Sequence, residues 1–253
     1  MQETQKKINT NGTENTKTFR KDDQICDMFN NISARYDFLN KILSFGIDCR
    51  WRKKLVRELK PYKPKQVLDV ATGTGNLALR IAKIKPQTII AVDVSEQMLR
   101  LGKEKIKKRK LDKLIKFKLA SCDELPFDNE SFDTVAIAFG VRNFEDPLKA
   151  MKEVYRVTEN DGVVMILEFG IPKNPVVRIP FLIYFTKILP IIGGLLSGKK
   201  YAYSYLTTSV KKFPFGKDFV EILDKAGFVD TAFKKCTFGV TYLYIARKNS
   251  NYC

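Results

Sequence analysis

The sequence predicts an α/β protein built around a doubly wound, mostly parallel sheet. From residue 66 onward, short apolar runs alternate with amphipathic segments, as expected for repeated strand–helix units. The first run ends at Val70 and is followed by Gly73 and Gly75, and the second run ends at Asp93. A chain of 253 residues is long enough to bury a good core in one such domain.

The N-terminal part is expected to divide into a tail and a helical layer. Residues 1–21 are polar and rich in Lys, Thr, Asn and Gln, which predicts a disordered tail. A single domain is expected over residues 22–253. Its first part, residues 22–62, has apolar side chains at helical spacing and predicts helices over the mouth of a pocket, ended by Pro61 and Pro64.

The first strand, the glycine turn and the helix after it predict a nucleoside-binding pocket. Gly73 and Gly75 let the backbone approach a ligand closely, and the N–H groups of the helix start favour negative charge. Asp93 follows Gly75 by 18 positions. This is close to the roughly 20-residue spacing expected for a carboxylate that binds ribose hydroxyls.

The glycine turn alone does not decide which ligand with a nucleoside part is bound. Gly73, Gly75 and Ala78 also fit the dinucleotide fingerprint, so NAD binding and a binding fold without chemistry are alternatives. Asp69 argues against NAD, because a carboxylate at the end of the first strand would repel a pyrophosphate. It suits a ligand that carries an ammonium and a sulfonium group, and S-adenosylmethionine is such a ligand.

The remaining elements are predicted in alternating order. Ser95 caps a helix, a third strand spans residues 115–119, and the loop at 120–127 lies at the sheet edge where ligands bind in open α/β sheets. The strand at 132–139 is apolar enough to be buried on both faces, and it brings residues 140–144 to the same edge. A helix is predicted at 147–157, followed by a turn at 160–162 and a strand at 163–169. A further helix is predicted at 213–227, with Gly227 at its C-terminal end. Strands at 228–234 and 238–246 are predicted to form an antiparallel hairpin at the edge of the sheet.

An apolar segment at 179–196 carries a single charge, Lys187, and approaches the length of a membrane span. Pro180, Pro190 and the Gly193-Gly194 pair argue against spanning. We therefore expect an apolar helical insertion, residues 172–210, that covers the pocket or touches a bilayer to collect a greasy substrate. An ordinary buried helical insertion is the alternative.

The formal net charge of +17 and the pI of about 9.6 allow several anionic partners. The densest run, residues 103–113, has six Lys and one Arg on what is predicted to be an exposed helix face. No aromatic side chains interleave that run, so a base-stacking platform for nucleic acid is not predicted. Attraction to anionic lipid headgroups fits the charge at least as well.

The cysteine and histidine content of the chain limits which metal ligands and general bases are available. Five widely spaced cysteines without a CxxC pair predict reduced thiols in a cytoplasmic protein and no metal site. The chain has no His, which removes the commonest general base and the commonest transition-metal ligand. No secretory signal is predicted at the N-terminus.

Several longer motifs carry a resemblance to a known family. They are Tyr-Asp-Phe-Leu-Asn at 36–40, Ser-Phe-Gly-Ile-Asp-x-x-Trp-Arg at 44–52, Leu-Pro-Phe at 125–127 and Phe-Gly-Val-Arg-Asn-Phe-Glu-Asp at 139–146. With these blocks the chain resembles the menaquinone/ubiquinone C-methyltransferase family over about residues 22 to 247. The run Ala-Tyr-Ser-Tyr-Leu at 202–206 with Phe213-Pro214 looks most like the bacterial demethylmenaquinone branch. Some ubiquinone-type members have His-Pro there, so any role of that His cannot apply here.

The resemblance implies a class I S-adenosylmethionine-dependent methyltransferase fold, which is Rossmann-like. It implies that the donor is held by Thr74 in the glycine turn, by Asp93 at the ribose and by the pair Ser121-Cys122. Relatives often have an acidic or amide residue at the position of Ser121, so Asp123 is held in reserve as the acceptor for the adenine amino group.

The implied acceptor is a polyprenyl naphthoquinol, methylated on a ring carbon. Phenols titrate near pH 10, so deprotonation at neutral pH requires about 3 pH units of assistance, roughly 4 kcal/mol. Arg142 is the candidate for stabilising the phenolate, and Asn143 would donate a second hydrogen bond. Without His, the proton acceptor is a carboxylate, a relay through Tyr36 or Tyr203, or water. A structural ion pair of Arg142 with Glu145 or Asp146 is the alternative role.

These expectations place the protein in the cytoplasm, peripherally associated with the inner face of the cell membrane, with a homodimer possible and no nucleic-acid partner. Two other functions stay open from the sequence. One is a benzoquinol C-methyltransferase of the ubiquinone pathway. The other, from a different class, is a basic RNA methyltransferase or RNA-binding protein, for which binding would be sensitive to salt.

Overall fold

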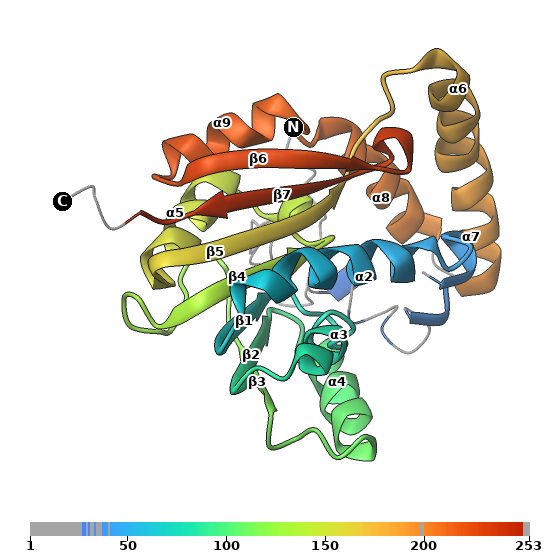
Figure 1. The fold of residues 1–253 in the computed structure, drawn as a ribbon. Helices are drawn as coiled ribbons and strands as arrows, with labels where there is room; N and C mark the ends of the chain where they lie inside the picture. Colours follow the sequence, from blue (N-terminus) through green and yellow to red (C-terminus); the bar gives the residue numbers. More distant parts are fainter. Residues whose placement is uncertain are drawn as a thin grey trace, which may run out of the picture.

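The computed structural model describes residues 27–28, 30, 33, 37–39, 41–197 and 200–249 (Figure 1). The tail predicted at 1–21 and the candidate Tyr36 lie outside these residues.

A seven-stranded sheet forms the centre of the molecule, in the order β3-β2-β1-β4-β5-β7-β6. Strands β1 to β5 are parallel, and β7 pairs antiparallel with both β5 and β6. The bounds are β1 Gln66–Val70, β2 Thr88–Asp93, β3 Ile115–Leu119, β4 Phe132–Ala138, β5 Thr158–Phe169, β6 Val229–Cys236 and β7 Thr241–Arg247. The predicted fold, a mostly parallel sheet with an antiparallel C-terminal hairpin, is confirmed.

Helices bury both faces of this sheet. The helices α2 (Ile47–Leu59) and α3 (Ala78–Ile81) pack with Ile106 of α4 (Glu96–Lys108) on one face. The helices α5 (Pro147–Val157) and α9 (Lys217–Lys225) cover the other face. Successive strand residues point to opposite sides, so Val67 joins the first layer and Leu68 the second. This explains why the central strands are apolar throughout.

The strand order creates the place for a ligand. From β1 the chain proceeds to β2 and β3 on one side of the sheet, and it then returns to β4 on the other side of β1. In open α/β sheets, ligands bind outside the carboxyl ends of the strands at such a reversal. The ends of β1, β2 and β4 carry Asp69, Asp93 and the segment after Ala138 to this edge.

The apolar segment forms a group of helices at one end of the sheet, next to the described N-terminal residues (Figure 1). It comprises α6 (Pro175–Ile183), a π-helical turn (Tyr184–Ile188), α7 (Leu189–Ser197) and α8 (Lys200–Lys212). By length and composition alone, Pro175–Leu195 could cross a membrane, and only 22% of its most apolar window is buried. Its buried side chains, Phe185 and Leu189, pack against Leu39, Leu43 and Tyr203.

Two element boundaries differ from the prediction. The turn expected at 160–162 lies within β5, which begins at Thr158; Asp161 has φ 62, and the pairing with β4 shifts register between Phe132 and Thr134. This is a bulge, which interrupts a strand without ending it. The helix predicted from residue 213 begins only at Lys217, because Pro214 disfavours helical backbone at Phe213 and Gly216 takes φ 72.

Candidate active site

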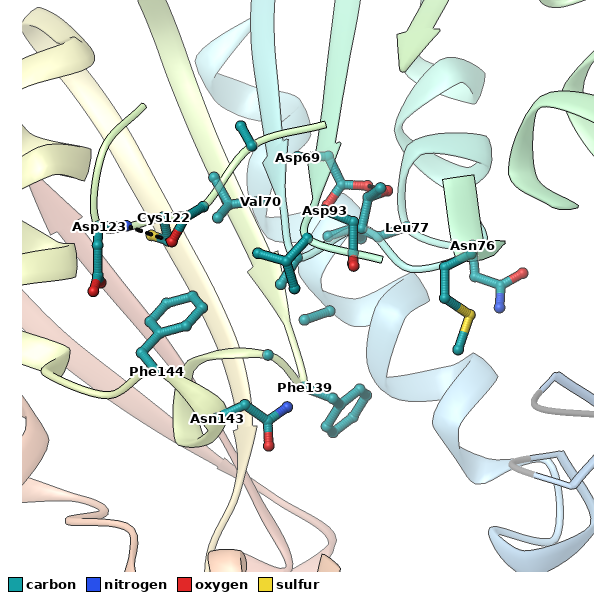
Figure 2. Close-up of a pocket in the computed structure, with 18 of the residues that line it drawn as sticks. Asp69, Val70, Asn76, Leu77, Asp93, Cys122, Asp123, Phe139, Asn143 and Phe144 are labelled. Atoms are coloured by element: carbon teal, nitrogen blue, oxygen red, sulfur yellow. Dashed lines mark hydrogen bonds between the residues drawn. The ribbon is translucent and has the colours of Figure 1, made fainter. Parts of the chain in front are cut away.

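A cavity of about 940 Å³, with several acids among its lining residues, opens at the carboxyl ends of β1, β2 and β4. Figure 2 shows Asp69 and Asp93 close together on one side of it, with Cys122, Asp123 and Phe144 on the other. The residues predicted from the sequence that line it are Asp69, Asp93, Ser121, Cys122, Asp123 and Asn143. We call this the donor cavity.

Asp69 presents a buried carboxylate oxygen that has no hydrogen-bond partner. Its Oδ2 accepts hydrogen bonds from the Thr72 hydroxyl at 2.6 Å and from the Ala78 backbone N–H at 3.0 Å. Its Oδ1 is buried and unpartnered. Burial, partly offset by those two hydrogen bonds, raises the pKa of Asp69 to about 7. A cationic group in the donor cavity would satisfy Oδ1 and stabilise the ionised form.

Asp93 is held by the backbone on both of its oxygens. Oδ2 accepts from the Gly73 N–H at 2.7 Å, and Oδ1 accepts from the Ser95 N–H at 2.9 Å. Burial raises the pKa of Asp93, against the lowering effect of these hydrogen bonds. Gly73 and Gly75 have φ of 56 and 79 and do not line the donor cavity. In the structure, therefore, the glycine turn orients the acid that faces the cavity.

Thr74 does not line the donor cavity. Its hydroxyl donates to Asp37 Oδ1 at 2.7 Å and accepts from Lys105 Nζ at 2.8 Å. Lys105 also pairs with Asp37 Oδ2 at 2.5 Å. Burial alone would raise the pKa of Asp37, but the hydrogen bond and charge of Lys105, with hydrogen bonds from Thr74 and Asn76, hold it below its usual range. Lys105, expected on a solvated helix face, thus joins the N-terminal layer to the glycine turn.

The segment after β3 forms the opposite wall. Ser121 bridges to Glu124, and the Ser121 hydroxyl accepts from the Asp123 N–H at 3.3 Å. Cys122 is buried beside the Ala150 carbonyl of α5. The ring of Phe144 lies on the same side of the cavity (Figure 2). This wall combines small polar groups with one aromatic face, which suits a flat, polar ring such as a purine.

A second, larger cavity of about 1290 Å³ is mainly apolar. Its walls come from the N-terminal layer, α2, the helices α6 to α8, and Phe139 and Phe169 at the sheet edge. Arg52 and Phe139 line both cavities, so the two meet at these side chains. The Arg52 guanidinium carbon lies 5.0 Å from the centre of the Phe139 ring, within range of a cation–π contact. We call this second space the acceptor cavity.

Arg142 lines the acceptor cavity and forms a buried ion pair. Its Nη1 lies 2.9 Å from Glu168 Oε1 and also donates to the Phe139 carbonyl. The side chains of Arg142 and Glu168 are 6% and 0% exposed, so the pair is isolated from water. The sequence suggested an ion pair of Arg142 with Glu145 or Asp146 as an alternative, but the observed partner is Glu168 on β5. The Arg142 Nε is buried and has no hydrogen-bond partner.

The other predicted catalytic residues divide between the cavities. Asn143 lines the donor cavity, whereas Tyr203 lines the acceptor cavity. The Tyr205 hydroxyl donates to Asn143 Oδ1 at 3.4 Å and so connects the two walls. The structure does not describe Tyr36.

Two residues at or near the junction, Arg52 and Asp48, were not among the site residues predicted from the sequence. Arg52 lines both cavities, and Asp48, one helical turn earlier in α2, binds it at 2.5 Å. The signal was present, because both residues lie in the block at 44–52 that carries the family resemblance. The sequence did not show that this block lies where the two cavities meet.

Comparison with known proteins agrees with this geometry. Residues 17–248 match the ubiE/COQ5 methyltransferase family. The chain belongs to this family. A demethylmenaquinone methyltransferase of Bacteroides fragilis is 42% identical over 230 residues, which cover 90% of this chain and 94% of the relative. A ubiquinone/menaquinone biosynthesis C-methyltransferase UbiE of Geobacter sulfurreducens is 42% identical over 230 residues, 90% of each chain.

Solved structures share the fold at low sequence identity. A putative S-adenosyl-L-methionine-dependent methyltransferase of Methanococcus maripaludis aligns with a TM-score of 0.60 and 17% identity, covering 95% of this chain and 98% of that one. Phosphoethanolamine N-methyltransferase 2 of Haemonchus contortus, in complex with S-adenosyl-L-methionine, aligns with a TM-score of 0.58 and 16% identity, covering 78% and 52%. The predicted methyltransferase fold is therefore confirmed.

Proposed function

We propose that this ubiE/COQ5-family methyltransferase uses S-adenosylmethionine to methylate a ring carbon of demethylmenaquinol, which yields menaquinol. The observation that carries the proposal is the junction at Arg52 and Phe139, where a cavity lined by buried acids meets a larger, mainly apolar cavity. Relatives at 42% identity are named for demethylmenaquinone and for ubiquinone/menaquinone biosynthesis. The paired cavities suit a charged donor and a greasy aromatic acceptor.

The donor cavity has groups that fit S-adenosylmethionine, which supplies a methyl group bound to a positively charged sulfur. Asp69 Oδ1, buried and unpartnered, would accept from the ammonium group. Asp93 would accept from the ribose hydroxyls through the lone pairs that Gly73 and Ser95 leave free. Ser121 and Cys122, with Asp123 in reserve, would face the adenine beside Phe144. Thr74 would act through the backbone of the glycine turn, since its side chain bonds Asp37 and Lys105.

The acceptor cavity has groups that fit a naphthoquinol. Its apolar walls would hold the rings and the start of the prenyl chain. Arg142 would stabilise developing negative charge on a ring oxygen through its free Nε, and Glu168 would hold the guanidinium in place. Asn143 and Tyr203 would orient the ring from the donor side and the acceptor side of the junction.

The apolar helices would collect this acceptor from a membrane surface. Exposed apolar side chains project from α6 and α7, at exposures between 38% and 81%: Val176, Ile179, Ile183, Ile191, Ile192 and Leu195. In the same group of helices, Phe185 of the π-helical turn and Leu189 of α7 line the acceptor cavity. We propose that the protein acts in the cytoplasm, in transient peripheral contact with the inner face of the cell membrane.

Quinone analysis tests the function. Mass spectrometry of cells that lack the protein should show accumulated demethylmenaquinone, and the wild-type gene should restore menaquinone. Accumulation of an unmethylated benzoquinol instead would assign the ubiquinone pathway. An unchanged quinone profile, together with salt-sensitive binding of RNA, would contradict the proposal and favour the RNA alternative.

Purified protein tests the role of Arg142. With a short-chain demethylmenaquinol, Arg142→Lys should lower kcat by about 100-fold or more, because an ammonium cannot reproduce the fixed donors of a guanidinium. Affinity for S-adenosylhomocysteine should stay close to wild type, which calorimetry would measure. Near-normal turnover of Arg142→Lys would show that the residue only supports the fold.

A further inference from the structure

Asp48 is a carboxylate at the acceptor cavity, in the first turn of α2. Its Oδ1 accepts from the Ser44 hydroxyl at 2.9 Å, and its Oδ2 accepts from Arg52 Nη1 at 2.5 Å. The side chain is 14% exposed. Each oxygen keeps a lone pair after these bonds, so the carboxylate is held in place and can still accept a proton.

Arg52 connects this carboxylate with the place where the two substrates would meet. Its guanidinium lines both cavities and lies over the ring of Phe139, which also lines both. Because Asp48 and Arg52 are four residues apart in a helix, they lie on the same face of α2. Asp48 is therefore one side chain away from the junction, on its acceptor side.

The other acids in the part of the chain that the structure describes do not line the acceptor cavity. Glu168 is fully buried and lines neither cavity; its Oε1 accepts from Arg142 and the Phe169 N–H, and its Oε2 accepts from the Arg142 N–H. Asp69, Asp93 and Asp123 line the donor cavity alone. Among the residues that the structure describes, Asp48 is the one carboxylate that lines the acceptor cavity. The chain has no His to take this role.

From these contacts we infer that Asp48 is the proton acceptor for the ring hydroxyl of the quinol. The inference rests on the proposed function. As the ring carbon beside the hydroxyl forms its bond to the methyl carbon, the hydroxyl proton passes to Asp48, and the electron pair of the broken carbon–sulfur bond stays on sulfur. The ring hydrogen then leaves to water and Asp48 returns its proton to the ring oxygen. The net products are the methylated quinol, S-adenosylhomocysteine and one proton.

A carboxylate is a suitable base because the proton moves during methyl transfer and not before it. A free phenol, with a pKa near 10, holds its proton too tightly for a carboxylate with an ordinary pKa near 4. During methyl transfer the ring oxygen changes toward a protonated carbonyl, which is far more acidic than a carboxylic acid. Transfer to Asp48 is then downhill, and the role of Arg52 and Ser44 is to aim the carboxylate.

The pH dependence separates Asp48 from the groups around it. The other charged or titratable side chains at the acceptor cavity are Arg52, Arg142, Tyr184, Tyr203 and Tyr205. The arginines stay protonated in the working range, and burial raises the pKa of Tyr184 above its ordinary value. Loss of turnover at acid pH, measured with the donor saturating, should be smaller in Asp48→Asn than in wild type, since burial raises the pKa of Asp69 and Asp93 in the donor cavity of both proteins alike.

The decisive experiment compares Asp48→Asn and Asp48→Glu with Glu221→Gln, which removes an exposed carboxylate on α9. Asp48→Asn should lower kcat by about 100-fold or more, the usual contribution of a general base. Its affinity for S-adenosylhomocysteine should match wild type, and Asp48→Glu should recover part of the rate. The loss should shrink for acceptors with a more acidic hydroxyl, which a structural role would not produce.

A binding measurement without turnover completes the test. With S-adenosylhomocysteine present, wild type should bind 1-naphthol more tightly than 1-methoxynaphthalene, which has no proton to donate, and Asp48→Ala should lose this preference. Equal turnover of Asp48→Asn and wild type, or an unchanged preference in Asp48→Ala, would overturn the assignment. Failure of wild type itself to methylate the naphthoquinol would instead contradict the proposed function.

Discussion

At the scale of single residues, the Asp69 carboxylate, which we propose binds the ammonium group of the donor, costs stability in the ligand-free protein. Its pKa rises from an ordinary 3.8 to about 7 on folding, chiefly through burial. Between these two pH values, Asp69 in the folded protein therefore keeps a proton that it has released in the unfolded chain. The stabilising effect of that proton is complete below pH 3.8 and is lost as the pH rises to about 7. Above that pH the free energy of unfolding is lower by up to about 4 kcal/mol.

The change Asp69→Asn should consequently stabilise the ligand-free protein while it weakens ligand binding. Urea unfolding at pH 8 should show a higher free energy of unfolding than wild type, and at pH 4 the difference should be small. Calorimetry at pH 8 should show affinity for S-adenosylhomocysteine reduced by about tenfold or more, since a charge-assisted hydrogen bond is worth roughly 1.5–3 kcal/mol. Unchanged affinity would show that Oδ1 does not face the ligand.

At the scale of elements, the carboxyl ends of β1 and β4 approach each other so closely that a side chain at Gly140 would overlap the Cβ of Ala71. Gly140→Ala should destabilise the protein by about 1–3 kcal/mol and displace the turn Val141–Asn143, which lowers kcat. Ala71→Gly in the same chain should restore both, because it removes the clashing atom and Ala71 already has φ 52. Urea unfolding and initial rates of the two single variants and the double variant test this; a double variant no better than Gly140→Ala would contradict it.

The contact between the N-terminal layer and the glycine turn is a second element-scale feature. Lys105 Nζ binds Asp37 Oδ2, the Thr74 hydroxyl and Asn76 Oδ1. Lys105→Met should lower affinity for S-adenosylhomocysteine by about fivefold, because the turn that orients Asp93 loses its support. Lys107→Met, which removes an exposed charge from the same helix, is the control. Adding Asp37→Asn should bring little further loss, since both changes break one network; additive losses measured by calorimetry would argue against it.

At the scale of the whole molecule, the apolar face of α6 and α7 lies on a chain of net charge +17. Binding should therefore be stronger to vesicles with anionic lipid than to neutral ones, and salt should weaken it. Changing Ile183, Ile191 and Leu195 together to Gln should reduce flotation with vesicles by about tenfold or more, since each buried apolar side chain contributes roughly 1.5–3 kcal/mol. Phe185 is unsuitable for this test because it is only 4% exposed.

The matched control for that experiment is Leu119→Gln. Leu119 is also an exposed leucine, at 56%, but it lies on the edge strand β3. If both variants lose flotation equally, the contact is not specific to the helices. Resistance of wild type to extraction at alkaline pH would indicate that the helix spans the bilayer.

Much of the fold was already determined by the sequence, because strands, caps and turns depend on residues that are neighbours in the chain. Alternating apolar runs predicted the parallel strands, and Ser95 was correctly identified as a helix cap. From the sequence, Asp69, Asp93 and the segment 120–123 were also expected at one edge of the sheet, because the carboxyl ends of parallel strands meet there. All of them line the donor cavity. The family was recognisable from the blocks at 44–52 and 139–146 for the same local reason.

Only the tertiary structure decided how the side chains of the site are used, because their partners are distant in the chain and the direction of each side chain is set by packing. The Thr74 hydroxyl bonds Asp37, which is 37 residues earlier, and Thr74 does not line the donor cavity. Arg142 pairs with Glu168, 26 residues later, on a strand that pairing alone places beside β4. The block at 44–52 lies at the junction of two cavities because α2 crosses the sheet there, and no local pattern encodes that crossing.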